Sequence, residues 1–98
     1  MRLKLVKVLT PQEAAIEQKL RPHQELIQEI EDLVIANLNE DGVATIECWK
    51  ASVYKLFPGQ IDAITLAFER SCWNVTYIDT PRGDWTLQFT ALRWAKNT

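Results

Sequence analysis

The sequence predicts a small α+β domain in which three to four helices pack on a short antiparallel sheet that ends in a C-terminal β-hairpin. Two alternating runs on either side of a Pro/Gly turn predict the hairpin, which we place at Cys72–Thr90. A wide apolar stripe with helical spacing after Pro22 predicts the main helix. The chain has 98 residues, 47% of them hydrophobic, and we expect one domain over 1–98.

The first elements are predicted from alternation and from a capping motif. Residues 1–10 alternate leucine with arginine or lysine at their start, which is typical of a short N-terminal strand. Thr10 and Glu13 then form a capping box around a proline at the first helical position, so we expect a helix over Pro11–Leu20. Pro22 should interrupt that helix.

The second helix extends from Pro22 to Leu38 and has one apolar face. That face consists of residues at steps of one, three and four: Leu26, Ile27, Ile30, Leu33, Val34 and Leu38. The turn that follows contains Gly42, which can take a left-handed conformation and so end the helix.

Three shorter elements precede the hairpin. Alternation predicts a strand over Val43–Cys48. Apolar spacing predicts helices over Trp49–Phe57 and Gln60–Ser71, which Pro58-Gly59 separates. In the first of these helices we expect Phe57 to face inward.

The hairpin strands are predicted over Trp73–Ile78 and Trp85–Thr90, with the turn at Asp79–Asp84. One face of the two strands carries large apolar residues: Trp73, Val75, Tyr77, Trp85, Leu87 and Phe89. We expect this face to cover the core, because buried aromatic side chains dominate packing energetics. Residues 95–98 should fray.

Composition excludes several classes of protein. The net charge is -2 and the pI is about 5.3, whereas a dedicated nucleic-acid binder is usually basic. Two cysteines are too few for a disulfide scaffold. No apolar run approaches the roughly 20 residues that span a bilayer, and the first ten residues lack the features of a signal peptide. We therefore expect a cytoplasmic protein that does not bind membranes.

The sequence contains no motif for catalysis, for a metal or for a cofactor, and we expect a protein that is not an enzyme. His23 is the only histidine, so it cannot pair with a second one to hold zinc with Cys48 and Cys72. Ser52 and Ser71 lie in predicted helices without a motif that supports nucleophilic catalysis. The acidic residues of the second helix lie on one solvated face, and the three glycines occur in turns.

The order of elements resembles winged helix-turn-helix domains. The corresponding segments are Ile27–Leu38, Val43–Cys48, Trp49–Phe57, Gln60–Ser71 and Cys72–Thr90. The resemblance concerns topology alone and covers about two-thirds of the chain. It implies that the short strand joins the hairpin, that the third helix enters the major groove of DNA, and that the hairpin turn forms the wing.

Binding of DNA is therefore one hypothesis for the function. The residues that would contact the nucleic acid are Lys50, Lys55, Gln60, Thr65, Arg70 and Arg82. The surface is poorly suited to phosphate, because the exposed face of the third helix also carries acids and Arg82 lies between Asp79 and Asp84. Fold alone does not decide function.

The favoured hypothesis is a small interaction or regulatory protein, of a kind that phages and mobile elements often encode. It would act through protein–protein contacts, with a partner protein or with a second copy of itself. The chain contains four tryptophans, and we expect at least one of Trp49 and Trp94 to contribute to the interface, where tryptophan is enriched.

Overall fold

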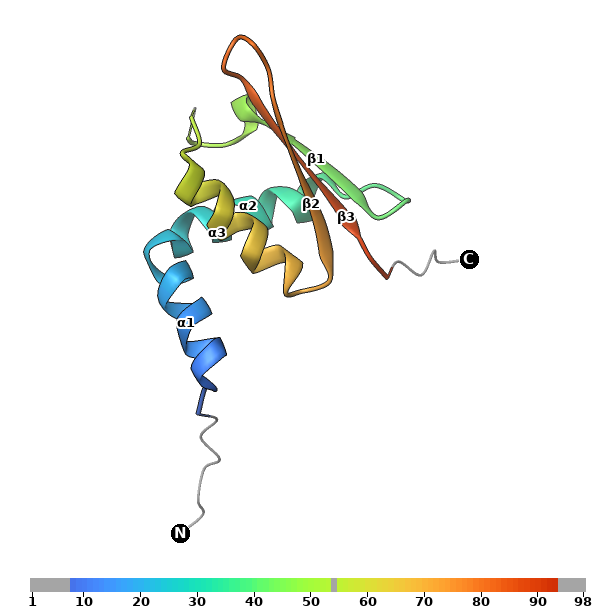
Figure 1. Ribbon diagram of the computed structural model, residues 1–98. Coiled ribbons are helices and arrows are strands. Elements are labelled where there is room, and N and C mark those ends of the chain that lie inside the picture. The colour runs from blue at the N-terminus through green and yellow to red at the C-terminus, as the bar shows by residue number, and fades with distance from the viewer. Residues whose placement is uncertain (1–7, 54, 94–98) are drawn as a thin grey trace.

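The computed structural model describes residues 8–53 and 55–93 (Figure 1). Three α-helices and three strands follow one another in the order α1 (Pro11–Leu20), α2 (Gln24–Asn37), β1 (Val43–Glu47), α3 (Pro58–Glu69), β2 (Trp73–Asp79) and β3 (Trp85–Ala91). Two short 3-10 turns, η1 (Arg21–His23) and η2 (Cys48–Lys50), precede α2 and follow β1. The α+β class is confirmed.

The three strands form one antiparallel sheet in the order β1-β3-β2. Leu87 on the central strand pairs with Ile46 on β1 and with Tyr77 on β2, so the side chains of all three point to the same face. The predicted hairpin is confirmed, and its predicted apolar face belongs to the core cluster. Trp85, Leu87 and Phe89 are almost completely buried there.

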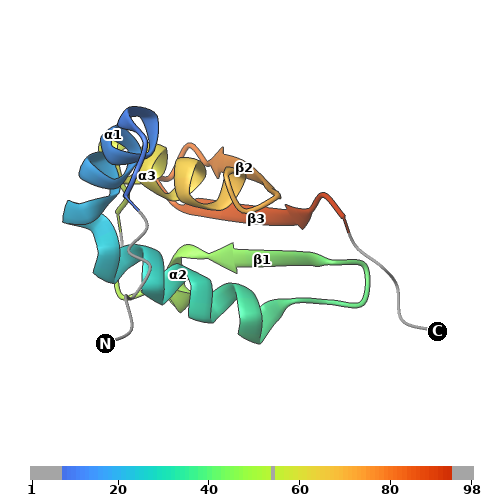
Figure 2. The same ribbon diagram turned by 90° about the horizontal axis from the view of Figure 1, so that it is seen from below.

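Two helices cover this apolar face of the sheet. Helix α2 packs against β1 and α3 packs against β2, as Figure 2 shows from below. The main buried residues of α2 are Leu26, Ile30 and Val34, and those of α3 include Ile64 and Phe68. These positions recur every three or four residues, which places them on one stripe of each helix.

The expectation that three to four helices pack on the sheet is wrong, because within residues 8–53 and 55–93 only α2 and α3 make extensive contact with it. The helix predicted over Trp49–Phe57 is replaced by the turn η2 and a loop without helix among its described residues. Phe57 is extended, with φ -86° and ψ 157°, because the following proline disfavours helical geometry. The described residues of this stretch therefore do not form the helix that was expected over Trp49–Phe57.

Helix α1 has the predicted bounds and the predicted capping box. The Glu13 amide donates to the Thr10 hydroxyl over 3.2 Å, and the Thr10 amide donates to the Glu13 carboxylate over 3.0 Å. Only Leu20 of this helix is buried. Helix α1 contacts α3 and extends away from the sheet (Figure 1).

Most of the predictions for the two ends of the chain are not tested by the structure. Residues 1–7 and 94–98 lie outside the described part, which leaves most of the predicted N-terminal strand and all of 95–98 untested. Val8 and Leu9 belong to no strand.

Gly42 adopts the expected left-handed conformation, with φ 76°. Cys72 adopts the same conformation after α3, with φ 68°.

Candidate protein-interaction surface

Residues 48–57, which we call the aromatic loop, connect β1 to α3 and are fixed to the core at three points. Cys48 and Leu56 are buried, with 4% and 7% of their surface exposed. Between them, the backbone amide and the hydroxyl of Ser52 donate to the two carboxylate oxygens of Glu29 on α2, over 2.5 and 2.6 Å. Hydrogen bonds to a charged acceptor are stronger than neutral ones, so this contact holds the middle of the loop against α2.

Trp49 is exposed because of the way in which its neighbours are held. The thiol of Cys48 turns inward and lies 3.9 Å from a carboxylate oxygen of Asp84. The Lys50 ammonium group donates to the side-chain oxygen of Asn37 at the end of α2, over 2.9 Å. With both neighbours attached to the body, Trp49 faces solvent with 72% of its surface exposed.

Phe57 is a second exposed aromatic residue on the same loop. Its side chain is 63% exposed, which corrects the expectation that it faces inward. Its amide donates to the side-chain oxygen of Gln60 over 2.9 Å, which fixes the backbone at the start of α3. The signal in the sequence was Pro58, because an extended residue before a proline does not continue a helical stripe.

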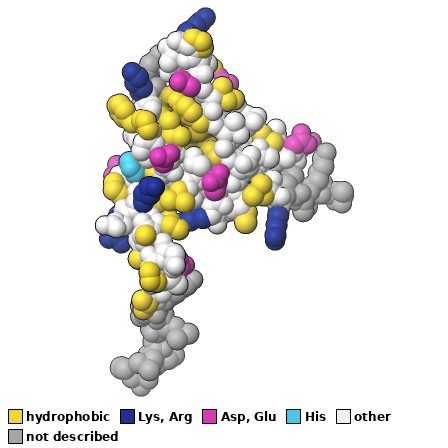
Figure 3. All heavy atoms as spheres, in the orientation of Figure 1, with side chains coloured by type: hydrophobic (Ala, Val, Ile, Leu, Met, Phe, Trp, Pro, Cys, Tyr) yellow, Lys and Arg dark blue, Asp and Glu magenta, His cyan; other side chains and the backbone are white. Residues whose placement is uncertain are grey.

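The aromatic loop is basic, whereas the chain as a whole is acidic. Residues 48–57 contain Lys50 and Lys55 and no acidic residue, while the whole chain has a net charge of -2. Both lysines are exposed. Figure 3 shows hydrophobic side chains gathered in the region between the hairpin and the start of α3. The loop therefore offers apolar surface next to positive charge.

The residues expected to contact DNA do not form one surface of free donors. Gln60 is used to cap α3, and Thr65 is half-buried on the same helix. Arg70 follows the other end of α3, ten residues from Gln60 and thus about 15 Å along the helix. Lys50 is bonded to Asn37.

Four of the expected DNA contacts are exposed, namely Lys50, Lys55, Arg70 and Arg82. Lys55 lies on the aromatic loop and Arg82 lies in the hairpin turn, between Asp79 and Asp84 in sequence. Trp94, the other residue expected at a protein interface, lies outside the described residues.

A pocket of about 260 Å³ brings together His23, Glu29 and Ser52 from three elements. Such a trio raises the question of nucleophilic catalysis, which needs a serine hydroxyl that donates to a base. The Ser52 hydroxyl donates to the Glu29 carboxylate, which is tied to the loop backbone by a second hydrogen bond from the Ser52 amide. We interpret this pair as the structural attachment of the loop. Within residues 8–53 and 55–93, no group of three or more histidine, cysteine or acidic side chains could hold a metal ion.

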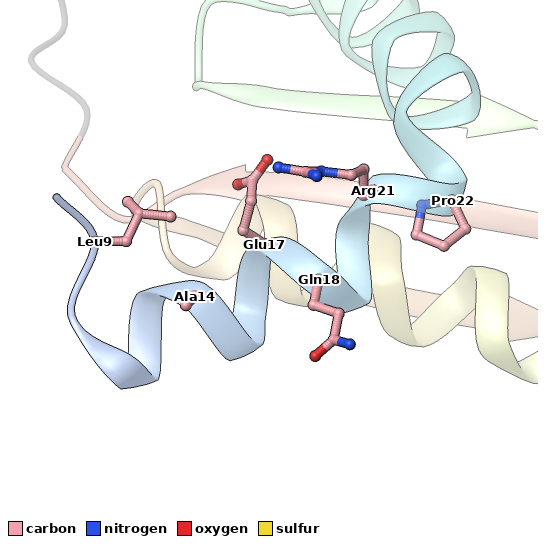
Figure 4. A pocket seen from close by; sticks show the side chains of 6 residues that line it. All are labelled: Leu9, Ala14, Glu17, Gln18, Arg21 and Pro22. Carbon is pink, nitrogen blue, oxygen red and sulfur yellow. The ribbon is translucent and has the colours of Figure 1, made fainter. Parts of the chain in front are cut away.

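Helix α1 is flanked by open hollows. One of about 540 Å³ extends along it and is lined by Leu9, Ala14, Glu17, Gln18, Arg21 and Pro22. Figure 4 shows the Glu17 and Arg21 side chains pointing toward one another on one side of the helix and Gln18 pointing away. A second hollow of about 460 Å³ adjoins α1, α2 and α3 and also includes Glu17.

These features define a class of molecule, a small α+β domain with a two-helix layer on a three-stranded sheet and an exposed aromatic loop at one end. No family model, curated protein or solved structure matches the chain. Among the described residues, no helix is both long and apolar enough to traverse a bilayer.

Proposed function

We propose that this chain is a non-enzymatic protein-interaction module whose aromatic loop binds an acidic, apolar segment of a partner protein. The observation that carries the proposal is the exposure of Trp49, at 72%, between Cys48, which is buried, and Lys50, which is bonded to Asn37. Tryptophan is enriched among the residues that dominate binding energy at protein interfaces.

The energetics favour burial of this side chain. An aromatic side chain removes 150–250 Å² from water when it is buried, which at about 25 cal/mol per Å² corresponds to on the order of 4 kcal/mol. The anchored loop reduces the entropy lost on binding, because Ser52 and Lys50 already hold it in one conformation. Most of the free energy from burying the Trp49 side chain would therefore contribute to the affinity for the partner.

Charge determines the kind of partner. Lys50 and Lys55 are exposed beside the aromatic residues, and residues 48–57 include no acid. A segment that carries aspartate or glutamate next to leucine or phenylalanine would complement both features. A basic segment would meet like charge on the loop and would bind less well.

The test uses the full chain and two synthetic peptides, one alternating glutamate with leucine and phenylalanine, the other with lysine in place of glutamate. We expect the acidic peptide to bind and the basic one to bind at least tenfold more weakly in calorimetric titration. Trp49→Ala should weaken binding of the acidic peptide at least tenfold. Ile35→Ala is the matched control, since Ile35 on α2 is 70% exposed, and it should leave binding unchanged.

Two results would overturn the proposal. The first is equal binding of the acidic peptide by the Trp49→Ala variant and by the unchanged chain, when thermal melting shows that both are folded. The second is duplex DNA binding that weakens steeply with salt and is abolished by Arg82→Glu, while Trp49→Ala has no effect on it. That second outcome would favour the DNA-binding alternative instead.

A further inference from the structure

A groove between the helices, distant in sequence from the aromatic loop, offers a second surface. Two adjoining hollows, of about 460 and 60 Å³, share Ile27, Glu31 and Ala67, and together they extend from α1 along the boundary of α2 and α3 to Trp73. We call them the helical groove. Its apolar lining consists of Leu20, Ile27, Ala67, Phe68 and Trp73.

The rim of the helical groove is acidic. Glu17, Glu25 and Glu31 line it, with Arg70 as the one basic residue among the described lining residues. Glu25 and Glu31 are exposed, so their charges face solvent and any ligand in the groove. An apolar floor with a surplus of carboxylates favours a ligand that combines apolar side chains with lysine or arginine.

The chain itself contains a segment of this composition directly before α1. Residues 1–7 include Arg2, Lys4 and Lys7, with no acidic residue, and their other members are all apolar. The described chain begins beside them with two exposed apolar residues, Val8 at 81% and Leu9 at 45%. Charge and hydrophobicity of the segment thus complement those of the groove.

The distances allow the segment to reach the groove within one molecule. Helix α1 has ten residues and is therefore about 15 Å long, whereas seven extended residues span about 23 Å. The hollow along α1 starts at Leu9 and includes Glu17, which also lines the helical groove. A chain returning from Leu9 along this hollow meets the acidic rim at Glu17.

We propose that residues 1–7 bind in the helical groove of the same chain, with their basic side chains opposite Glu17, Glu25 and Glu31 and their apolar side chains on its floor. This contact is independent of the aromatic loop. It adds a strap across α1, α2 and α3.

A double-mutant cycle in the full chain tests the contact. Lys4→Glu/Lys7→Glu and Glu25→Lys/Glu31→Lys should each lower the melting temperature, by about 3–6 °C for a domain of this size. Their combination restores the opposite charges, so it should melt within about 2 °C of the unchanged chain. Strictly additive losses in the combined variant would overturn the proposal.

A matched control uses acids outside the groove. Glu47→Lys/Asp62→Lys makes the same change in charge on β1 and α3, at residues that do not line the groove. Combined with Lys4→Glu/Lys7→Glu, it should show no restoration. Restoration of equal size would mean that net charge alone produces the effect, and it would overturn the proposal.

A readout that does not depend on stability completes the test. In nuclear magnetic resonance spectra of the full chain, Lys4→Glu/Lys7→Glu should shift the signals of Ile27, Ala67 and the Trp73 indole, while Lys55→Glu should not. Unchanged signals at those three residues would overturn the proposal. Sedimentation should show a monomer, and a dimer that dissociates in the Lys4→Glu/Lys7→Glu variant would overturn docking within the same chain.

Discussion

Cys72, three residues after the end of α3, adopts a left-handed conformation that costs a residue with a side chain about 1–2 kcal/mol, whereas glycine adopts it freely. Its amide donates to the Glu69 carbonyl over 3.3 Å, and its carbonyl accepts from Leu92, so the backbone there is held on both sides. Cys72 is exposed and forms no disulfide.

We expect Cys72→Gly to raise the free energy of unfolding by about 0.5–1 kcal/mol, the difference between the relieved strain and the added flexibility of the unfolded chain. Urea denaturation of the reduced protein measures it. Ser71→Gly is the control, because Ser71 lacks a positive φ and should lose stability on the same change. Equal losses in both variants would contradict this account of Cys72.

The stability of the fold should depend on pH in the alkaline range because of the phenol of Tyr77. Burial, and to a smaller extent the neighbouring Asp79 carboxylate, raise the pKa of this phenol above its usual value of 10.0. The folded chain thus keeps the proton more tightly than the unfolded chain. The stability from this group is complete below pH 10.0 and is lost as the pH rises through the higher pKa of the folded state.

The corresponding experiment compares the unchanged chain with Tyr77→Phe at a series of pH values above 9. The free energy of unfolding should fall more steeply with pH in the unchanged chain, because only it carries the titrating group at this position. The difference between the two curves isolates Tyr77 from the lysines and from Tyr54. If the free energy of unfolding fell equally with pH in both proteins, the Tyr77 phenol would have the same pKa in the folded and unfolded chains, which would contradict the prediction.

At the scale of elements, the attachment of the aromatic loop to α2 depends on Glu29. Glu29→Ala removes the acceptor of two hydrogen bonds from Ser52 and should lower the free energy of unfolding by about 1 kcal/mol, since the pair is partly exposed to water. Amide hydrogen exchange in residues 48–57 should accelerate as well. Asp62→Ala, at an exposed position on α3, should change neither quantity.

The same loop shows why one element could not be predicted from the sequence. The partner of Ser52 lies 23 residues away, so no local pattern reveals that the chain bonds to α2 instead of forming a helix. Apolar residues in Trp49–Phe57 fit a helical spacing equally well. The hairpin, α1 and α2 were predictable, because alternation, a capping box and a wide stripe are local signals.

For the whole molecule, the sequence was sufficient for the class and the apolar faces, but not for the number of helices on the sheet. Helix α1 has its predicted bounds and yet lies outside the layer, because it buries little beyond Leu20. Its sequence gives it no strong apolar stripe that would require a partner. The layer of α2 and α3 emerges only from packing between residues far apart in the chain.

The residues of the candidate site were likewise predicted only in part. Trp49 was predicted as an interface residue from the abundance of tryptophan, and the structure finds it exposed. Phe57 was misplaced because the predicted helix was wrong. The helical groove could not be predicted, since it requires the relative positions of three helices that contribute Leu20, Ile27 and Ala67.

The central position of β3 has a consequence for the time at which the sheet can form. Both β1 and β2 have β3 as their only partner among the described strands, and β3 is the last of the three in the chain. During synthesis on a ribosome, α2 and β1 must therefore wait for residues 85–91 before any strand pairing is available to β1. Until then the apolar side chains of β1 have only helices to pack against, which makes the nascent chain most vulnerable to misassociation just before its final strand emerges.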